Sequence, residues 1–331
     1  MTMKGKAIGK FCGTALITAL FFVQAQAADT LRPIKGTSAV SWFQHLVLQK
    51  GLEAVGYSVG EHAEAKFPIL HLTLANGDAD YTAHHWNPLH DAFYKKSGGD
   101  DVMTRFHSMT TGCAQGYLID KATADKHNIT NIDQIIKNPE IAKLFDSDGD
   151  GKANLTGCDP GWGCERVIEH QMDAFDMRGS VNHDQGSYFA LIANTIARYE
   201  QGDPVFYYTW TPMWLGAVLV PGKNVVWLNV PFSASPDDPN ADTSAADGSN
   251  SGFAMNTQEI VANNDFLAKN PAAKRFFELY RMPLGDIATQ NLKVHNGEKE
   301  MSDAIRHADE WIAANQDTFD SWVAEAKKVG L

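Results

Sequence analysis

The sequence has few basic residues for its length. Its 331 residues include 28 Lys and Arg against 40 Asp and Glu, which gives a formal net charge of −12. An acidic chain of this kind is repelled by nucleic acid and by anionic lipid surfaces. After residue 27 there is also no run near the roughly 18 apolar residues that a transmembrane helix requires. We therefore expect no nucleic-acid partner and no membrane span in that part of the chain.

Several sequence motifs of catalysis are absent as well. The chain contains no SxxK motif, no phosphate-binding P-loop, no GxGxxG dinucleotide motif and no HExxH metal motif. These patterns place a nucleophile, a phosphate or a metal in a defined local structure. Their absence leaves catalysis without a candidate, and we expect that the protein is not an enzyme.

The first residues predict export from the cytoplasm. Lys4, Lys6 and Lys10 form a basic start, an apolar run covers residues 14–23, and the small residues of AQAA fit cleavage after Ala27. We interpret residues 1–27 as a secretory signal peptide and expect a periplasmic protein. Its removal leaves 25 basic residues against 40 acidic ones, a net charge of −15.

Three cysteines follow the signal segment. In an oxidising compartment Cys158 and Cys164, which flank the loop DPGWG, should form a disulfide. Closing so short a loop contributes only about 2 kcal/mol through chain entropy. Local rigidity is therefore the better explanation for this disulfide. Cys113 is left over and is expected to be a buried, unreactive side chain.

The remaining pattern is typical of an α/β protein, and its length favours two domains. Amphipathic helices are expected over residues 41–55, 187–201, 266–280, 301–314 and 319–329. Strands are expected over residues 69–74, 81–83, 114–120, 204–210 and 224–232. Residues 233–252 are almost wholly polar or small and are expected to be a surface loop or a connection between lobes.

Eight tryptophans are many for this length. Four of them, Trp42, Trp227, Trp311 and Trp322, lie in predicted helices or a strand and are expected to pack in the core. Trp86, Trp162 and Trp210 instead lie in HHWNPLH, PGWGC and YYTWTPMW, which are rich in Pro, Gly, His or Thr. We expect these three indoles to be exposed in irregular segments and to bind a ligand.

Two ligand classes suit three exposed indoles, namely carbohydrates and quaternary ammonium compounds. A quaternary ammonium group has no N–H to donate, so aromatic faces bind it, with about 2 kcal/mol for each desolvated contact. Three contacts give about 6 kcal/mol, whereas micromolar affinity requires about 8 kcal/mol. The carboxylate of a betaine supplies the remainder if His90 and the N–H groups beside Trp162 bind it. An exported enzyme acting on sugars is the alternative, and Asp91 and Glu165 are its nearest candidate carboxylates.

Two patterns raise the question of a metal. His84, His85 and His90 have no acidic or cysteine partner at a familiar spacing, so we assign no zinc site. In DSDGDG, residues 146–151, Asp146, Asp148 and Asp150 match the first ligand positions of a calcium-binding loop, but the twelfth position is Gly157, where a glutamate is required. A weak structural calcium site and a solvated acidic turn both remain open. We expect no other cofactor.

Four segments of the chain resemble the periplasmic glycine betaine and proline betaine-binding proteins of ABC importers. The segments are HWNPLHD (residues 85–91), AQGYLIDKATAD (114–125), KLFDSDGDGKANLTGCDPGWGCE (143–165) and PVFYYTWTPMW (204–214). The resemblance extends over the whole chain after the signal segment. It implies a two-lobed type II periplasmic binding protein fold, with the ligand in the cleft between the lobes.

The resemblance also implies the residues of the site. Trp86, Trp162 and Trp210 would enclose the trimethylammonium group, and His90 with the backbone N–H groups of Gly163 and Cys164 would bind the carboxylate. Residues 28–114 and 250–331 would form lobe one, and residues 115–249 would form lobe two. The partners would be a small zwitterionic quaternary ammonium ligand and a permease driven by a cytoplasmic ATPase, and we expect a monomer. Choline or carnitine is the nearest alternative ligand.

Overall fold

The computed structural model of the chain describes residues 1–2 and 30–330. The expected signal peptide, residues 1–27, therefore lies almost wholly outside the described residues. None of the helices in residues 30–330 combines the length and the apolar character that a bilayer span demands.

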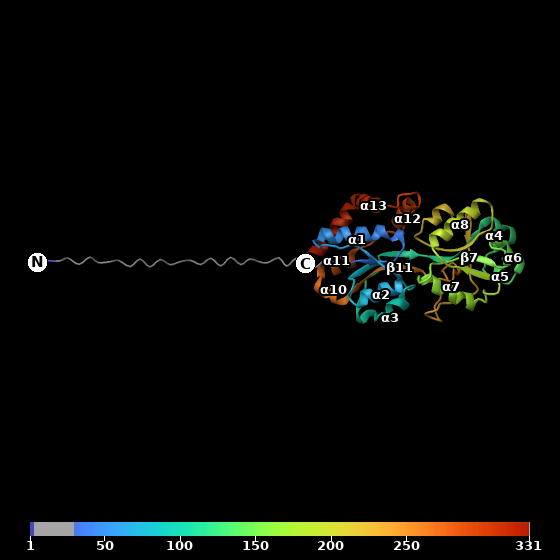
Figure 1. The fold of residues 1–331 in the computed structure, drawn as a ribbon, viewed down its shortest axis with the longest axis horizontal. Coiled ribbons are helices and arrows are strands. Elements are labelled where there is room, and N and C mark those ends of the chain that lie inside the picture. The colour runs from blue at the N-terminus through green and yellow to red at the C-terminus, as the bar shows by residue number, and fades with distance from the viewer. Residues whose placement is uncertain (3–29, 331) are drawn as a thin grey trace.

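The described residues form two α/β bodies that lie side by side, each built on its own sheet (Figure 1). In the first sheet, β11 pairs antiparallel with three other strands. The members of this sheet are β3 (Tyr81–Asn87), β4 (Met103–Arg105), β5 (Thr110–Cys113) and β11 (Asn256–Asn263). The second sheet has the order β10-β6-β9-β7-β8. Its members are β6 (Gln115–Asp120), β7 (Ala153–Thr156), β8 (Val181–Asp184), β9 (Phe206–Trp210) and β10 (Val225–Trp227).

Helices cover both sheets. The helices of the first body are α1 (Trp42–Val55), α2 (Phe67–Ala75), α3 (Asp91–Lys96), α10 (Asn264–Lys269), α11 (Pro271–Leu279), α12 (Leu284–His295), α13 (Met301–Ala314) and α14 (Gln316–Lys327). Those of the second body are α4 (Lys121–His127), α5 (Asp133–Ile136), α6 (Pro139–Ala142), α7 (Gly163–Ala174), α8 (Tyr188–Glu200) and α9 (Leu215–Val218). Smaller pieces are β1 (Ile34–Lys35), β2 (Ala63–Glu64) and three short 3₁₀ turns over residues 39–41, 99–101 and 143–145.

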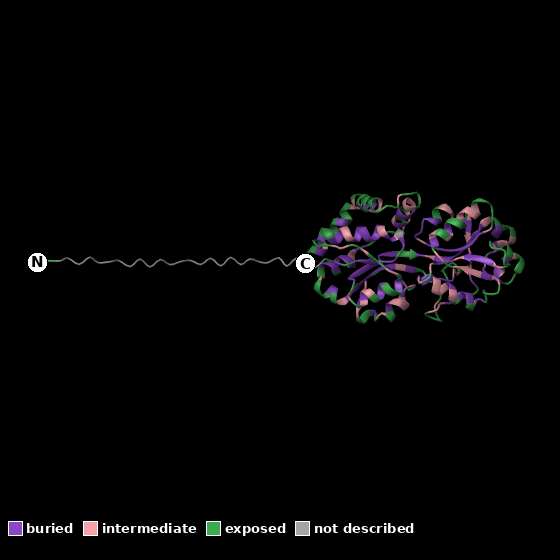
Figure 2. Ribbon diagram, in the orientation of Figure 1, coloured by how far each residue is buried: buried purple, intermediate pink, exposed green. Residues whose placement is uncertain are grey.

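The core of each body lies between its sheet and its helices. Figure 2 shows buried residues along the strands and on the inner faces of the helices, with exposed residues outside. In the first body, α1 packs against α11, α13 and α14 through apolar side chains that include Leu48, Leu52 and Phe276. The chain passes from the first sheet to the second directly between β5 and β6, and it returns between β10 and β11. Strand ends of both sheets therefore meet at these crossings.

Two predictions of secondary structure are wrong. Residues 69–74 were expected to form a strand but lie in α2, where Pro68 occupies the first turn and Leu70 and Leu74 are buried on one face. The helix expected over 266–280 is two helices, because Pro271 begins a new helix after α10 ends. Residues 233–252 lie outside helices and strands and are mostly exposed, as expected for a surface loop.

Candidate functional site

A pocket lies where the two bodies meet. Its walls come from β3, α1, α2, β11 and α12 of the first body and from β6, α7 and β9 of the second body. The lining residues are Ser38, Val40, Ser41, Gln44, Phe67, His84, Trp86, Leu89, His90, Gln115, Trp162, Gly163, Cys164, Tyr208, Trp210, Pro212, Gln258, Ile287 and Asn291. All six residues that the sequence singles out for ligand binding thus line one pocket.

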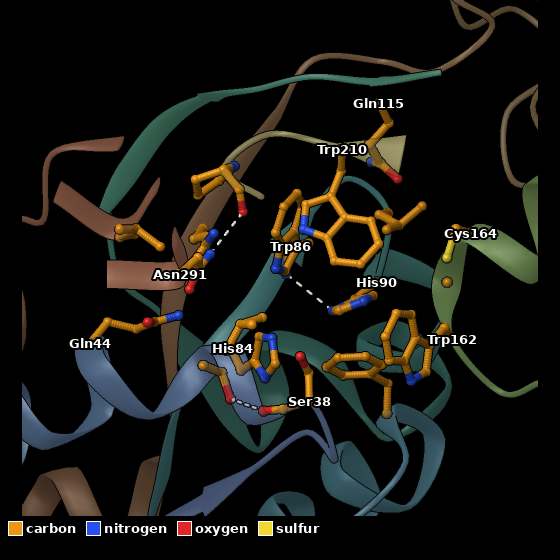
Figure 3. Close-up of a pocket in the computed structure, with 18 of the residues that line it drawn as sticks. Ser38, Gln44, His84, Trp86, His90, Gln115, Trp162, Cys164, Trp210 and Asn291 are labelled. Carbon is orange, nitrogen blue, oxygen red and sulfur yellow. Dashed lines mark hydrogen bonds between the residues drawn. The ribbon is translucent and has the colours of Figure 1, made fainter. Parts of the chain in front are cut away.

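The three tryptophans reach this pocket from three elements (Figure 3). Trp86 is on β3, Trp210 ends β9 and Trp162 is the residue before α7. The expectation that they are exposed in irregular segments is wrong, because two lie on strands and their exposed fractions are 7%, 8% and 9% for Trp86, Trp162 and Trp210. The reason is the enclosure of the pocket by the two bodies. Of the four other tryptophans assigned to the core, Trp311 is buried and the rest are partly buried.

Tyr188, the first residue of α8, supports two of the indoles. Its ring lies 4.7 Å from that of Trp210 and 6.2 Å from that of Trp162, centroid to centroid. Its hydroxyl donates to Thr209 Oγ1 at 2.9 Å, which fixes the ring. The Trp162 and Trp210 rings are 5.7 Å apart at an angle of 76°. Two indole faces are thus set nearly at right angles, an arrangement that can surround a rounded apolar cation.

The N-terminus of α7 provides donors for an anion. The helix begins at Gly163, and its N-cap residue is Trp162, whose side chain does not cap it. The first N–H groups of a helix have no partner within the helix, and the helix dipole makes this end positive. Gly163 also allows a close approach of the two bodies, because a Cβ there would lie 2.6 Å from Leu89 Cγ. The backbone N–H groups of Gly163 and Cys164 are therefore available at the pocket wall.

His90 adds a neutral donor. Its Nδ1 accepts the backbone N–H of Trp86 at 3.1 Å, so the ring hydrogen lies on Nε2. Burial holds the pKa of His90 well below its usual value, with the neighbouring His85 and His71 acting in the same direction. Phe67 lies against the imidazole, with ring centroids 3.9 Å apart. The His90 ring is thus fixed in orientation and remains uncharged at neutral pH.

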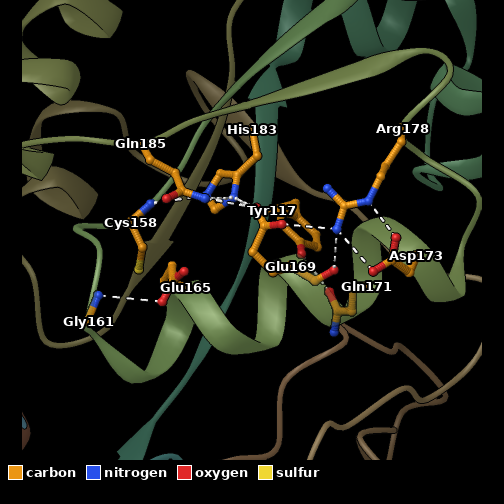
Figure 4. Close-up of polar contacts among 10 residues, drawn as sticks. All are labelled: Tyr117, Cys158, Gly161, Glu165, Glu169, Gln171, Asp173, Arg178, His183 and Gln185. Atoms are coloured by element: carbon orange, nitrogen blue, oxygen red, sulfur yellow. Dashed lines mark hydrogen bonds and ion pairs between the residues drawn. The ribbon is translucent and has the colours of Figure 1, made fainter. Parts of the chain in front are cut away.

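The disulfide between Cys158 and Cys164 is confirmed and closes the loop that carries Trp162, with Cα atoms 6.2 Å apart. Gly161 in this loop has φ +90, a conformation that favours glycine. The loop is also attached to β8, because Cys158 N–H donates to His183 Nε2 and His183 Nδ1 contacts Glu169 Oε1 at 2.6 Å (Figure 4). Both ends of the loop are therefore fixed. Cys113 is buried and free, and burial raises the pKa of its thiol to about 12.

Removal of the disulfide should weaken ligand binding more than it unfolds the protein. In a Cys158→Ser, Cys164→Ser variant we expect a loss of about 2 kcal/mol in stability and a roughly tenfold weaker affinity for glycine betaine, since the loop must be ordered on binding. Calorimetric titration and urea unfolding measure the two quantities. Cys113→Ala is the control for loss of a buried sulfur. Unchanged affinity in the double variant would show that the disulfide does not preorganise the loop.

Several contacts join the bodies beside the pocket, and two of them lie near the loop that carries Trp162. Lys66 Nζ donates to the carbonyl oxygen of Pro160 at 2.9 Å. On the other side, the Arg166 guanidinium lies over the Phe93 ring at 5.2 Å and pairs with Asp237 of the surface loop. These contacts connect this part of the second body to α2 and α3 of the first body.

The carboxylates proposed for sugar chemistry do not line the pocket. Asp91 pairs with Arg105 at 2.9 Å, and Glu165 accepts the Gly161 N–H at 3.4 Å. No Asp or Glu side chain is among the pocket-lining residues in the described chain. The pentapeptide GYSVG, residues 56–60, matches the GxSxG pattern, but Ser58 is exposed and follows the end of α1, so the strand–turn–helix context of a nucleophile is missing.

The three aspartates of residues 146–150 converge. One oxygen of each of Asp146, Asp148 and Asp150 lies within 4.8 Å of the others. The loop itself uses both carboxylate oxygens of Asp146 as hydrogen-bond acceptors, because they accept the backbone N–H groups of Gly149 and Gly151. These bonds lower the pKa of Asp146. The geometry suits both a weak calcium site and a solvated acidic turn, and the calcium site stays a prediction.

Several pocket residues carried no local sequence signal. Ser38, Gln44, His84, Gln115, Gln258 and Asn291 add polar groups, and Tyr188 supports the indoles. Register explains two of them, because Gln258 pairs with Trp86 across β11 and β3, and Gln115 pairs with Trp210 across β6 and β9. Cross-strand partners share a face of the sheet. Only strand pairing, which the local pattern does not give, could have revealed them.

Two α/β bodies with a pocket between them, joined by two crossings of the chain, fit the type II periplasmic binding protein fold. The solved structures of similar fold bear this out. A choline-binding protein of an ABC transporter in complex with choline gives a TM-score of 0.70 at 16% identity, covering 90% of this chain and 96% of that one. Lactococcal OpuAC, closed on glycine betaine, gives 0.68 at 17% identity, covering 89% and 99%.

Sequence comparison gives the family. Residues 36–314 match the family model described as the substrate binding domain of ABC-type glycine betaine transport systems, and the chain belongs to this family. It is 49% identical over 319 residues to the glycine betaine/proline betaine-binding periplasmic protein of Escherichia coli (strain K12), covering 95% of this chain and 96% of that protein. It is 48% identical over 322 residues to the glycine betaine-binding periplasmic protein OusX of Dickeya dadantii (strain 3937), covering 95% of each.

Proposed function

We propose that this protein is the periplasmic receptor that captures glycine betaine and proline betaine and delivers them to an ABC importer. The observation that carries the proposal is the convergence, in one pocket, of three indoles with the free N-terminus of α7 and a neutral histidine. A betaine has a methylated cation at one end and a carboxylate at the other. It therefore requires both the indoles, for the cation, and the N–H donors, for the carboxylate.

The indoles bind the cation. Trp86, Trp162 and Trp210 present apolar, electron-rich faces to methyl groups that carry the spread positive charge. No carboxylate side chain lines the described pocket, so the aromatic faces meet no competing anion there. At about 2 kcal/mol for each desolvated face, the three faces together supply about 6 kcal/mol.

The carboxylate binds at the other group of donors. The N–H groups of Gly163 and Cys164 and the Nε2–H of His90 approach it from both bodies. Because these donors are already oriented before binding, the ordering cost is small. A hydrogen bond to a charged group contributes about 1.5–3 kcal/mol, which supplies the remainder of micromolar affinity.

Closure follows from the location of these groups. We assign residues 28–114 and 250–331 to lobe one, which holds Trp86 and His90, and residues 115–249 to lobe two, which holds Trp162 and Trp210. A ligand that contacts both lobes stabilises the closed state through its differential contacts. The receptor acts as a monomer after loss of residues 1–27, has no catalytic role and no nucleic-acid partner, and docks on a permease driven by a cytoplasmic ATPase.

Choline tests the carboxylate site. It keeps the cation but lacks the carboxylate, so its affinity should be roughly 10- to 100-fold below that of glycine betaine. Titration of the purified protein, followed by tryptophan fluorescence and calorimetry, measures both ligands. In His90→Ala, betaine should lose most of this advantage while choline changes little.

Equal affinity of the wild-type protein for choline and glycine betaine would remove His90 as the carboxylate donor. If neither glycine betaine nor choline gives a binding signal in calorimetry, the betaine assignment itself is wrong. Carnitine, which carries a cation and a carboxylate farther apart, is the next ligand in that case.

A further inference from the structure

One end of the pocket contains polar groups that a small betaine does not use. Ser38 Oγ, Gln44 Oε1 and Gln258 Oε1 are buried and have no hydrogen-bond partner among the described residues. Gln44 and Gln258 are each only 2% exposed. A buried polar atom without a partner costs about 1–3 kcal/mol, so such atoms in a pocket wall indicate a partner that arrives with the ligand.

These atoms line the pocket together with two further polar side chains. We call the set Ser38, Gln44, His84, Gln258 and Asn291 the polar end. Figure 3 shows Gln44 and Asn291 across the pocket from Cys164, with the indoles of Trp86 and Trp210 between them, and shows His84 and Ser38 between Gln44 and Trp162. The N-terminus of α7 and the amides of Gln44 and Asn291 therefore lie on opposite sides of the pocket, while the Phe67 ring contacts both His84 and His90, with centroid distances of 5.1 Å and 3.9 Å.

The polar end offers both donors and acceptors. His84 Nδ1 accepts the Gly36 N–H at 3.2 Å, so its Nε2 carries the hydrogen and is a donor. Burial lowers the pKa of His84 to about 3, with Lys35 adding to the effect, so this ring is neutral. Gln258 Nε2 donates to Cys113 Sγ at 4.0 Å, which leaves its Oε1 as an acceptor, and Gln44 Oε1 is a second acceptor. Asn291 is held in place by donation to the Pro212 carbonyl oxygen at 3.2 Å.

The chemistry of this end fits a neutral group. No charged side chain belongs to the pocket lining in the described part of the chain, so neither a second carboxylate nor a second cation would find a counter-ion. A hydroxyl group needs one acceptor for its hydrogen and at least one donor to its oxygen, and the polar end provides both.

We propose that the polar end is a subsite for a hydroxyl group that a betaine carries on the side of its cationic nitrogen away from the carboxylate. The ring hydroxyl of 4-hydroxyproline betaine has this placement. The proposal rests on the proposed function, because it takes the carboxylate end from that assignment, and it extends the substrate class to hydroxylated betaines.

Calorimetric titration with proline betaine and 4-hydroxyproline betaine tests the subsite. In the wild-type protein the hydroxylated ligand should bind at least as tightly as its parent, because the hydrogen bonds to the glutamines compensate for desolvation of its hydroxyl. In a Gln44→Met, Gln258→Met variant, which keeps side-chain length, the hydroxylated ligand should lose roughly tenfold in affinity. Proline betaine, which lacks the hydroxyl, should lose clearly less affinity in this variant than the hydroxylated ligand does.

Gln290→Met is the matched control. Gln290 is also buried with an unpartnered Oε1, but it lies outside this pocket, so its loss should change neither affinity. A wild-type preference of more than roughly tenfold for proline betaine, or equal loss of both ligands in the double variant, would overturn the subsite. If neither betaine binds the wild-type protein, the proposed function is wrong as well. If both betaines bind and one of the outcomes above is found, only the subsite is wrong.

Discussion

Lowering the pH from about 6.5 to about 5 should reduce the free energy of unfolding by about 3 kcal/mol. The cause is a set of buried neutral histidines around the pocket. Burial lowers the pKa of His71 and of His84 from 6.5 to about 3, and His45, His85 and His90 shift in the same direction. Below pH 6.5 the unfolded chain binds protons at these positions while the folded protein does not.

The sign and the range follow from these values. The contribution of each histidine is fully present above its unfolded pKa of 6.5 and decreases as the pH falls toward its folded pKa. The cost of each group rises from about 0.7 kcal/mol per pH unit at pH 6.5 to about 1.4 kcal/mol per unit near pH 5, so His71 and His84 together account for about 3 kcal/mol over about 1.5 units. Carboxylates with lowered pKa values reduce the free energy of unfolding only in more acidic solution. For Glu298, whose pKa is lowered from 4.5 to about 2, this loss begins near pH 4.5.

Urea unfolding at several pH values measures this effect. His71 does not line the pocket: it donates from Nδ1 to the Phe67 carbonyl oxygen at 2.7 Å, and its Nε2 contacts His85 Nδ1 at 2.9 Å. A His71→Gln variant should be less stable at neutral pH but should lose up to about 1.4 kcal/mol less for each pH unit of acidification. His107→Gln, at an exposed position, removes an imidazole without contact with this cluster. A stability that is flat between about pH 6.5 and pH 5 would contradict the prediction.

The second large effect concerns an indole of the pocket. Trp162→Ala should weaken glycine betaine binding at least roughly 30-fold, because one desolvated aromatic face contributes about 2 kcal/mol. The loss includes the support that Trp162 gives to Trp210 at 5.7 Å. Trp162→Phe retains an aromatic face and should lose less. Calorimetric titration measures both variants.

Trp227→Ala is the control for tryptophan removal. Trp227 lies on β10, is partly buried and does not line the pocket, so its loss should leave betaine affinity unchanged. Thermal unfolding of each variant separates binding from stability. Wild-type affinity in Trp162→Ala would mean that the indole closes the pocket without contacting the cation.

Much of the site could be predicted from the sequence because its parts are local. The loop from Cys158 to Cys164 fixes its own shape through one disulfide and a glycine at positive φ, and it leads directly into the N-terminus of α7. His90 lies four residues after Trp86, whose N–H it accepts. Spacing along the chain predicted the disulfide, whereas the roles of His90 and of the helix N-terminus were supported by the resemblance to the family.

The rest was not predictable because it depends on which segments pair. The α2 helix was mistaken for a strand because its apolar run is short and fits both the spacing of a helix and that of a strand. Only its packing against the first sheet decides that it is a helix. The indoles were expected to be exposed, because no local pattern shows that a second body covers them. Gln258 reaches the pocket only through its pairing with Trp86, which is 172 residues away in the chain.

The sequence by itself determined the chemistry of the two ligand ends. It supplied the aromatic residues, the rigid loop before a helix, and the histidine beside Trp86, since each depends on neighbours along the chain. The tertiary structure alone decided the enclosure and the polar end. Gln44 on α1, Gln258 on β11 and Asn291 on α12 are distant in sequence, and only the packing of these elements buries their amide groups and brings them to one pocket.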